Sequence, residues 1–247
     1  MPNTIEFFSE PRNWVMNQSK LLAVGVMVGA IALTGCESTP TQTQNVSPIL
    51  QQASADAPTL MMQAASNGDI EQIKKLIESG HGVNVETPQG TALSWALNQN
   101  RIGAAQYLLS IGADPNLGVK KGGESLLMKM AEKGETQLVK WLLAAGSDVN
   151  YLDTNGDSAL SRAAYEGHLT TVKALLKVGA NVNTAPRGES LLMHIVNNND
   201  LLIAQVLINA GADVNYIDDA GRSALQIARE KGFGDLEMLL MQSGATS

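Results

Sequence analysis

Residues 158–183 read SALSRAAYEGHLTTVKALLKVGANVN, and this stretch decides the fold. Leu160, Ala163 and Ala164 have the i, i+3, i+4 spacing that lines one face of a short helix. Gly167 follows as the left-handed residue that ends such a helix. Because apolar residues with helical spacing resume at once, a second helix is predicted over 169–177. The stretch therefore encodes a helical hairpin that ends in a turn at 179–183.

From residue 58 onward this hairpin recurs about every 33 residues. The residues equivalent to Leu160 are Met61, Leu93, Leu127, Leu192 and Leu225, and a ladder of glycines runs through Gly80, Gly112, Gly146, Gly179, Gly211 and Gly244. Asn100 and Asn199 replace the helix-ending glycine in two units, and Asn tolerates the same conformation. Aromatic residues make up only 4% of the chain, so the expected core is aliphatic. The pattern predicts six units that stack on one another, at about 58–89, 90–122, 123–155, 156–187, 188–220 and 221–247.

A longer period, which spans two units, is superimposed on the shorter one. GESLLM occurs at 123–128 and again at 188–193, and VNYLD at 149–153 recurs as VNYID at 214–218. The array is therefore predicted to be three pairs of units. The turns alternate in charge, with Lys120, Lys121 and Arg187 after one kind of unit and Asp153, Asp218 and Asp219 after the other.

Residues 158–168 and 211–215 resemble the ankyrin repeat, whose pattern is T-P-L-H-x-A-A followed by G, V, L-L and G-A-D-V-N. The resemblance extends over 58–247 and implies an all-α ankyrin-type solenoid with short β-turn fingers and a concave groove that binds proteins. The His of the family pattern is absent, and its place is taken by Met62, Ser94, Met128, Ser161, Met193 and Gln226. That His ties hydrogen bonds between neighbouring loops in the family, so the single repeats are expected to be looser.

Composition and motifs argue against several kinds of chemistry. The chain has 17 basic and 24 acidic residues, and a net charge of -7 opposes nucleic-acid binding. One Cys and three His are too few for a disulfide framework or a Cys/His zinc site. Ser158 sits in a GDS triplet, but Thr91, Ser125, Ser190 and Ser223 hold the same place, where a hydroxyl caps a helix. His81 and His168 have no base or second ligand at useful spacing, so we expect no enzyme, cofactor, metal or small-molecule substrate.

Binding residues are predicted on the first helix of each unit. The positions two and six residues after the matched apolar residue lie about 200° and 240° around the helix and point away from its packed face. The resemblance places this stripe in the concave groove. Its predicted partner contacts are Trp95, Gln99, Lys129, Lys133, Arg162, Glu166, His194, Asn198 and Ile227, and the stripe extends to Gln63, Asn67 and Lys231. Predicted finger contacts are Lys120, Lys121, Tyr151, Asp153, Arg187, Tyr216 and Asp218.

These residues suggest the kind of partner. An outward Trp95 next to three cations favours a protein with an acidic and partly apolar surface, because an uncovered Trp wastes its apolar area. The alternative interpretation is a solvated helix face. Trp141, on the second helix, is expected to pack partly against its neighbours.

Residues 1–57 carry a different signal. Residues 21–33 read LLAVGVMVGAIAL, which is too short to span a bilayer but suits the apolar part of a signal peptide. Residues 33–36, LTGC, resemble the bacterial lipobox, which implies that 1–35 is removed and that Cys36 is acylated; the alternative is a buried Cys. Glu6 and Glu10 disturb the leading segment, so translation is predicted to start at Met16. Residues 36–57 form a predicted flexible tether.

Two functions are consistent with this sequence. The first is a lipid-anchored periplasmic protein that binds a protein partner in its groove, as a scaffold or as an inhibitor or immunity protein. Glu37 after the Cys favours the outer over the inner membrane by resemblance to enterobacterial sorting. The second is a structural envelope component that assembles with itself, because the last unit leaves Phe233, Met238 and Met241 without a following turn.

Overall fold

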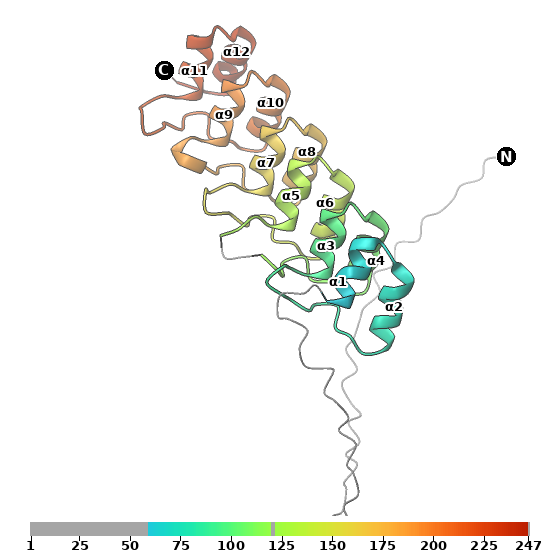
Figure 1. The fold of residues 1–247 in the computed structure, drawn as a ribbon. Coiled ribbons are helices and arrows are strands. Elements are labelled where there is room, and N and C mark those ends of the chain that lie inside the picture. The colour runs from blue at the N-terminus through green and yellow to red at the C-terminus, as the bar shows by residue number, and fades with distance from the viewer. Residues whose placement is uncertain (1–58, 120–121, 247) are drawn as a thin grey trace, which may run out of the picture. The chain divides into compact units, whose positions relative to one another are not determined.

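The computed structural model describes residues 59–119 and 122–246, so the predictions on residues 1–57, including Cys36, and on Lys120 and Lys121 lie outside the described residues. Each of the six predicted units contains one helical hairpin, whose first and second helices form an inner and an outer layer (Figure 1). The inner helices are α1 (Leu60–Asn67), α3 (Ala92–Asn98), α5 (Leu126–Glu132), α7 (Ala159–Tyr165), α9 (Leu191–Asn197) and α11 (Ala224–Lys231). The outer helices are α2 (Ile70–Glu78), α4 (Ile102–Ser110), α6 (Thr136–Ala144), α8 (Leu169–Lys177), α10 (Leu201–Asn209) and α12 (Gly234–Gln242).

Serine or threonine hydroxyls cap the N-termini of the inner helices. In α7 the Ser161 amide donates to Ser158 Oγ at 3.1 Å, and the Ser158 amide donates back to Ser161 Oγ at 2.8 Å. Thr59, Thr91, Ser125, Ser190 and Ser223 cap the other five inner helices. The predicted role of Ser158 as a helix cap is therefore confirmed. Asn100 and Asn199 have φ of 55° and 59°, as the sequence predicted for residues in the place of glycine.

The core is aliphatic and runs through the whole stack. Leu160 and Ala163 are fully buried, and so are Val172 and Leu175 of α8, whose bounds match the predicted helix. Fingers of irregular chain join the hairpins, with isolated bridges at Thr87 and Ile217 in two of them. No helix within the described ranges is both long enough and apolar enough to traverse a bilayer.

The inner helices pack in pairs. α1 lies close to α3, α5 to α7 and α9 to α11, whereas α3 and α5, and likewise α7 and α9, lie farther apart. The alternation predicted from the two-unit period is thus present in the packing. Its sequence counterpart is the first residue of each helix, which is Ala in α3, α7 and α11 but the larger Leu126 and Leu191 in α5 and α9. The wider spacing leaves room for a pocket on the inner face.

Asparagine side chains link each turn to the next unit. The Asn150 amide group donates to the Gly179 carbonyl at 3.4 Å, and Asn150 Oδ1 accepts from the Asn181 amide at 2.8 Å. Asn84, Asn116, Asn183 and Asn215 make the same two contacts with the units that follow them. A typical hydrogen bond within a protein contributes about 0.5–1.5 kcal/mol to stability, and these bonds are exposed to solvent. The ladder connects the loops although the His of the family pattern is absent.

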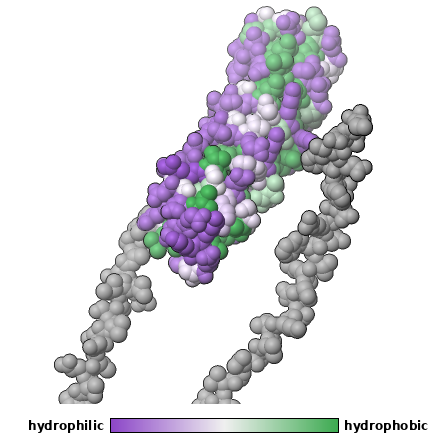
Figure 2. Space-filling model, turned by 90° about the vertical axis from the view of Figure 1, so that its right-hand side faces the viewer, coloured by the Kyte–Doolittle hydropathy of each residue, from purple (hydrophilic) through white to green (hydrophobic). Residues whose placement is uncertain are grey.

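The outer helices carry apolar residues in contact with solvent. Figure 2 shows this side of the molecule, where apolar patches interrupt a mostly polar surface. Leu202 of α10 is 66% exposed, and Met238 and Met241 of α12 are 56% and 47% exposed. Trp141 of α6 packs against the core, as predicted.

Candidate functional site

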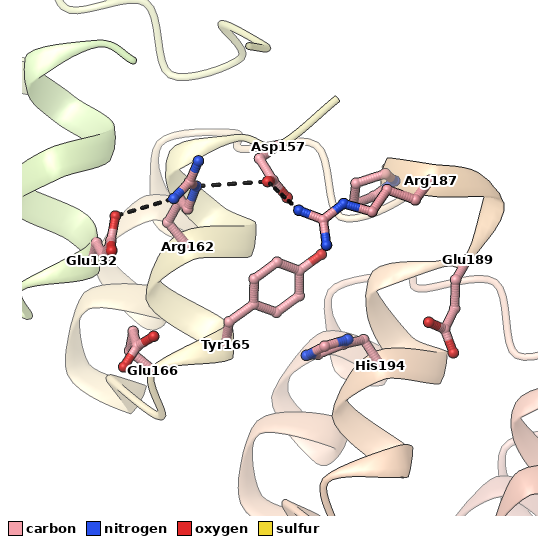
Figure 3. A pocket seen from close by; sticks show the side chains of 9 residues that line it. Glu132, Asp157, Arg162, Tyr165, Glu166, Arg187, Glu189 and His194 are labelled. Carbon is pink, nitrogen blue, oxygen red and sulfur yellow. Dashed lines mark hydrogen bonds and ion pairs between the residues drawn. The ribbon is translucent and has the colours of Figure 1, made fainter. Parts of the chain in front are cut away.

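A pocket of about 320 Å³ opens on the inner face between α7 and α9, where two pairs of units meet (Figure 3). Its walls come from α7, α9, the end of α5 and the finger that contains the short 3-10 helix η1 (Pro186–Gly188). We call it the inter-pair pocket, and it is lined by Glu132, Asp157, Arg162, Tyr165, Glu166, Pro186, Arg187, Glu189 and His194. Its position follows from the wide spacing between α7 and α9.

Arg162 forms one end of the pocket and is held by three carboxylates. Its guanidinium lies 3.2 Å from Glu132, 3.0 Å from Asp153 and 3.7 Å from Asp157. The Asp153 and Asp157 side chains are only 6% and 4% exposed, and Arg162 is 24% exposed. Arg162 lies on the inner face as predicted but is paired within the protein, and its contact with a partner stays a prediction. Its charge is neutralised within the protein, because the guanidinium compensates two acids that the fold buries.

Asp153 holds a turn of its finger, and its predicted contact with a partner stays a prediction. Its Oδ1 accepts from the amides of Asn155 at 2.8 Å and Asp157 at 3.0 Å, while Oδ2 accepts from Arg162. Partial burial opposes ionisation, but the hydrogen bonds from the Asp157 amide and from Arg162 outweigh it and hold the pKa of Asp153 below its usual value.

Asp218 repeats this arrangement two units later. Its carboxylate accepts from the backbone amides of Ala220 and Arg222 and from the Arg222 guanidinium, 2.9 Å away. The backbone hydrogen bond from Arg222 is the main cause of its lowered pKa. These bonds use most of the acceptor capacity of Asp218 within its own turn, and the predicted contact with a partner stays a prediction.

Two rings form the wall opposite Arg162. The centroids of Tyr165 and His194 are 4.1 Å apart and their planes are tilted by 51°. Burial raises the pKa of Tyr165 far above its ordinary value, and the nearby charge of Asp157 adds to the effect. The hydroxyl therefore stays protonated at neutral pH, and Figure 3 shows it directed toward Arg187.

The rim of the pocket is acidic. Glu166 is exposed, and Glu132 and Glu189 are half-buried. The lining carries four carboxylates, those of Glu132, Asp157, Glu166 and Glu189, against two guanidiniums, those of Arg162 and Arg187. The carboxylates therefore outnumber the guanidiniums by two.

The remaining stripe residues follow the predicted orientation, with one exception. Gln99, Lys133 and Asn198 are exposed, and Trp95, Lys129 and His194 are half-buried. Gln63, Asn67 and Lys231, at the ends of the stripe, are exposed as well. The Lys129 ammonium lies 3.9 Å from the carboxylate of Glu124, whose pKa is raised by burial.

Ile227 is the exception, because it is 3% exposed and belongs to the core. α11 lies close to α9, and the short Ile side chain does not reach beyond the contact between the two helices. The prediction of Ile227 as a groove residue is wrong for this reason.

The aromatic finger residues are placed against the protein. Tyr216 donates from its hydroxyl to the Gly188 carbonyl at 3.3 Å, and the Tyr151 hydroxyl is buried without a hydrogen-bond partner among the described residues. Arg187 is exposed, with 75% of its side chain in contact with solvent. It has φ of 59° and lies 3.8 Å from Asp157.

Other candidate chemistry has structural roles in the described part of the chain. His168 Nε2 lies 2.9 Å from the Glu132 carbonyl, and His81 lies beside Ser79 in a turn. Within residues 59–119 and 122–246 no group of three or more His, Cys, Asp or Glu side chains could hold a metal ion.

The sequence pattern did not predict Tyr165, Asp157 and Glu189 as pocket residues. A signal for Tyr165 was present in the repeat alignment. The same helix position holds Ser66, Asn98, Glu132, Asn197 and Glu230 in the other units, so an aromatic ring there is a departure.

Comparison with known protein families shows which type of repeat the six units are. A model of three consecutive ankyrin repeats matches residues 36–119 and 116–186, and a model of a single ankyrin repeat matches 187–219. The chain belongs to the ankyrin repeat family. Ankyrin repeats typically serve protein–protein interaction, and the predicted fold class, an all-α ankyrin-type solenoid, is confirmed.

Individual ankyrin repeat proteins resemble the chain over most of its length. It is 30% identical over 221 residues to the ankyrin repeat protein YahD of Escherichia coli, with 76% of this chain and 97% of that protein covered. The structure of an ankyrin repeat domain from Acinetobacter baumannii matches with a TM-score of 0.70 and 32% identity, covering 75% of this chain and 98% of the other. An L-asparaginase of Dirofilaria immitis is 30% identical over 212 residues, which span 72% of this chain but only 30% of that enzyme. This partial match carries no activity over to the ankyrin chain.

Proposed function

We propose that this ankyrin repeat protein binds a protein partner along its inner face, and that the inter-pair pocket receives a Lys or Arg side chain of that partner. The observation that carries the proposal is the pocket itself, which joins an acidic rim to an aromatic wall. A cation can lie against the Tyr165 and His194 rings while its charge faces the carboxylates of Glu166 and Glu189.

This proposal revises the expected charge of the partner. The sequence predicts an acidic partner from Trp95 and three cations of the stripe, one of which is Arg162. With Arg162 held by Glu132, Asp153 and Asp157, the pocket favours positive charge. Trp95 remains a candidate for a second contact, on an apolar part of the partner, because it is half-buried on the same inner layer.

Site-specific photocross-linking in cells tests the proposal. A photoreactive residue replaces Glu166 at the rim of the pocket, and in a matched variant it replaces Lys173, which is exposed on the outer helix of the same hairpin. We expect a discrete cross-linked protein from position 166 and none from position 173, with loss of the product when Tyr165→Ala is added. The same products from both positions, or no product from position 166, would contradict the proposal.

We also propose that Cys36 carries a lipid anchor, and that this anchor inserts into the outer rather than the inner membrane. The ankyrin domain would then face the periplasm. The support is the signal-like apolar run and LTGC at 33–36. Two or more acyl chains would hold the protein stably at a membrane. Labelling cells with an alkyne fatty acid should mark the protein and should fail with Cys36→Ser; label on the Cys36→Ser variant would refute the anchor.

Self-assembly is a second candidate, favoured by the exposed Met238 and Met241 on the last outer helix. Sedimentation of the purified protein separates the two functions. A sedimentation coefficient that rises with concentration and falls with Met238→Lys would favour assembly, whereas a constant value favours a protein that binds another molecule.

A further inference from the structure

A second cavity lies between the outer helices α6 and α8 and shares no residue with the inter-pair pocket. Its volume is about 490 Å³, and we call it the outer groove. Typical sites for small molecules occupy about 300–1,000 Å³ and are mostly apolar, with a few polar groups that fix orientation. The outer groove has this composition.

One small residue accounts for the outer groove. Ala174 lines it and is the sixth residue of α8. The sixth residues of the other outer helices that follow a neighbour are Tyr107, Trp141, Val206 and Leu239, and all of them pack on the core. Because Ala174 ends at its Cβ, the space that a larger side chain occupies in the other units stays open here.

The floor of the outer groove is apolar. Leu143 and Val149 line it on the side of α6, and Val178, which is 51% exposed, borders it after the end of α8. Exposed aliphatic side chains beside a cavity favour a ligand with an alkyl part, because covering them removes apolar surface from water.

The charged side chains of the outer groove are both cationic. Lys140 and Lys177 line it and are exposed, and neither has an ion pair with an acid of the described residues. Ser147 Oγ is buried without a hydrogen-bond partner among these residues, which is uncommon for a buried hydroxyl. The equivalent residue is His81 in the first unit and Ala113, Ala180, Ala212 and Ala245 in the others, so the hydroxyl is particular to this unit.

We propose that the outer groove binds an aliphatic carboxylate. Its alkyl chain lies on Leu143, Val149 and Val178, and its carboxylate accepts hydrogen bonds from Lys140 and Lys177 at the rim. Two ammonium groups without acidic partners among the described residues select a negative charge. This inference concerns a site separate from the one that binds a protein partner, and it stands if that function fails.

Binding of decanoate to the purified protein tests the inference. The probe is titrated below its micellar concentration and followed by NMR shifts of amides in α6 and α8. Three probes serve as comparisons: decanol lacks the charge, decyltrimethylammonium reverses it, and acetate lacks the chain. We expect saturable binding of decanoate, at least tenfold tighter than that of each comparison probe.

Two variants address the residues. Lys140→Gln with Lys177→Gln should weaken decanoate binding at least tenfold, while Lys75→Gln with Lys173→Gln, a matched loss of two exposed lysines outside the groove, should leave it unchanged. Ala174→Leu places in the groove the residue found at the same position of α12, and it should abolish binding with an unchanged urea midpoint.

Several results would overturn the inference. Equal binding of decanoate and decanol would mean that the groove takes an uncharged apolar group, such as a side chain of a protein. Equal binding of decyltrimethylammonium, no saturable binding of decanoate, or unchanged affinity in the Lys140→Gln, Lys177→Gln variant would each refute a carboxylate site.

Discussion

Replacing Arg162 with Met tests whether its guanidinium stabilises the stack or is available to a partner. The substitution keeps an apolar stem of similar length and leaves the carboxylates of Asp153 and Asp157, only 6% and 4% exposed, without their main counter-charge. Removing one partner of a buried ion pair costs about 3–5 kcal/mol. Arg162 is itself 24% exposed, and Asp153 keeps two backbone hydrogen bonds, so we expect the smaller loss of about 2 kcal/mol in the free energy of unfolding.

Urea denaturation followed by far-ultraviolet circular dichroism measures this loss. Arg187→Met is the matched control, because Arg187 is 75% exposed and has one contact with Asp157 at 3.8 Å, which predicts a change below about 0.5 kcal/mol. Adding Asp157→Asn to Arg162→Met should restore part of the stability, since the uncompensated charge is then gone. Equal losses for Arg162→Met and Arg187→Met would refute the reasoning.

Three further predictions concern the fold. The lowered pKa of Asp153 means that its contribution to stability is present above about pH 4 and is lost as the pH falls through that lowered pKa. The urea midpoints of wild type and Asp153→Asn should therefore differ most at neutral pH and converge as the pH falls below about 4; a constant difference would contradict this. Gly134→Ala should lower the free energy of unfolding more than Gly167→Ala does. Both glycines have positive φ, so an alanine costs about 1–2 kcal/mol at either position. At Gly134 the new Cβ would also lie 2.6 Å from His168 Nδ1, whereas at Gly167 it has no heavy atom within 4 Å. Ile227→Ala should lower the free energy of unfolding by about 2–4 kcal/mol in the same urea assay, because Ile227 is buried. An unchanged midpoint would mean that its side chain is exposed.

The fold was predictable because its determinants are local and repeated. The caps at Ser158 and its equivalents, the left-handed Asn100 and Asn199 and the bounds of α8 all follow from short-range spacing that each unit shows again. Agreement between six copies removes the ambiguity that a single short apolar run would carry.

The candidate site was predictable only in part, because exposure on the inner face depends on the spacing between neighbouring helices. A helical wheel treats Arg162 and Ile227 alike, as outward residues two positions after the matched Leu. The close approach of α11 to α9 buries Ile227, and acids from α5 and from the preceding finger surround Arg162. Neither fact is contained in the sequence of one helix, so long-range packing decided both outcomes.

To predict which residues line the cavities, one must compare equivalent positions in all the units, because the helical pattern of one unit does not show which residues depart from the repeat. Tyr165 stands where the other inner helices have Ser, Asn or Glu, and Ala174 stands where the other outer helices have larger residues. The outer groove therefore arises from a single departure from the repeat, and another departure supplies the aromatic wall of the inter-pair pocket; such departures are easily overlooked when the regular positions are used to assign the fold.

The affinity of the cross-linked partner for charge variants of the inter-pair pocket tests the central claim most directly. Glu166→Gln with Glu189→Gln removes two negative charges from the rim, and Glu78→Gln with Glu86→Gln removes two exposed charges elsewhere. We predict that calorimetric titration gives at least a tenfold weaker Kd for the first pair and an unchanged Kd for the second. Equal effects of the two pairs, or tighter binding by Glu166→Gln with Glu189→Gln, would contradict a pocket that holds a basic side chain.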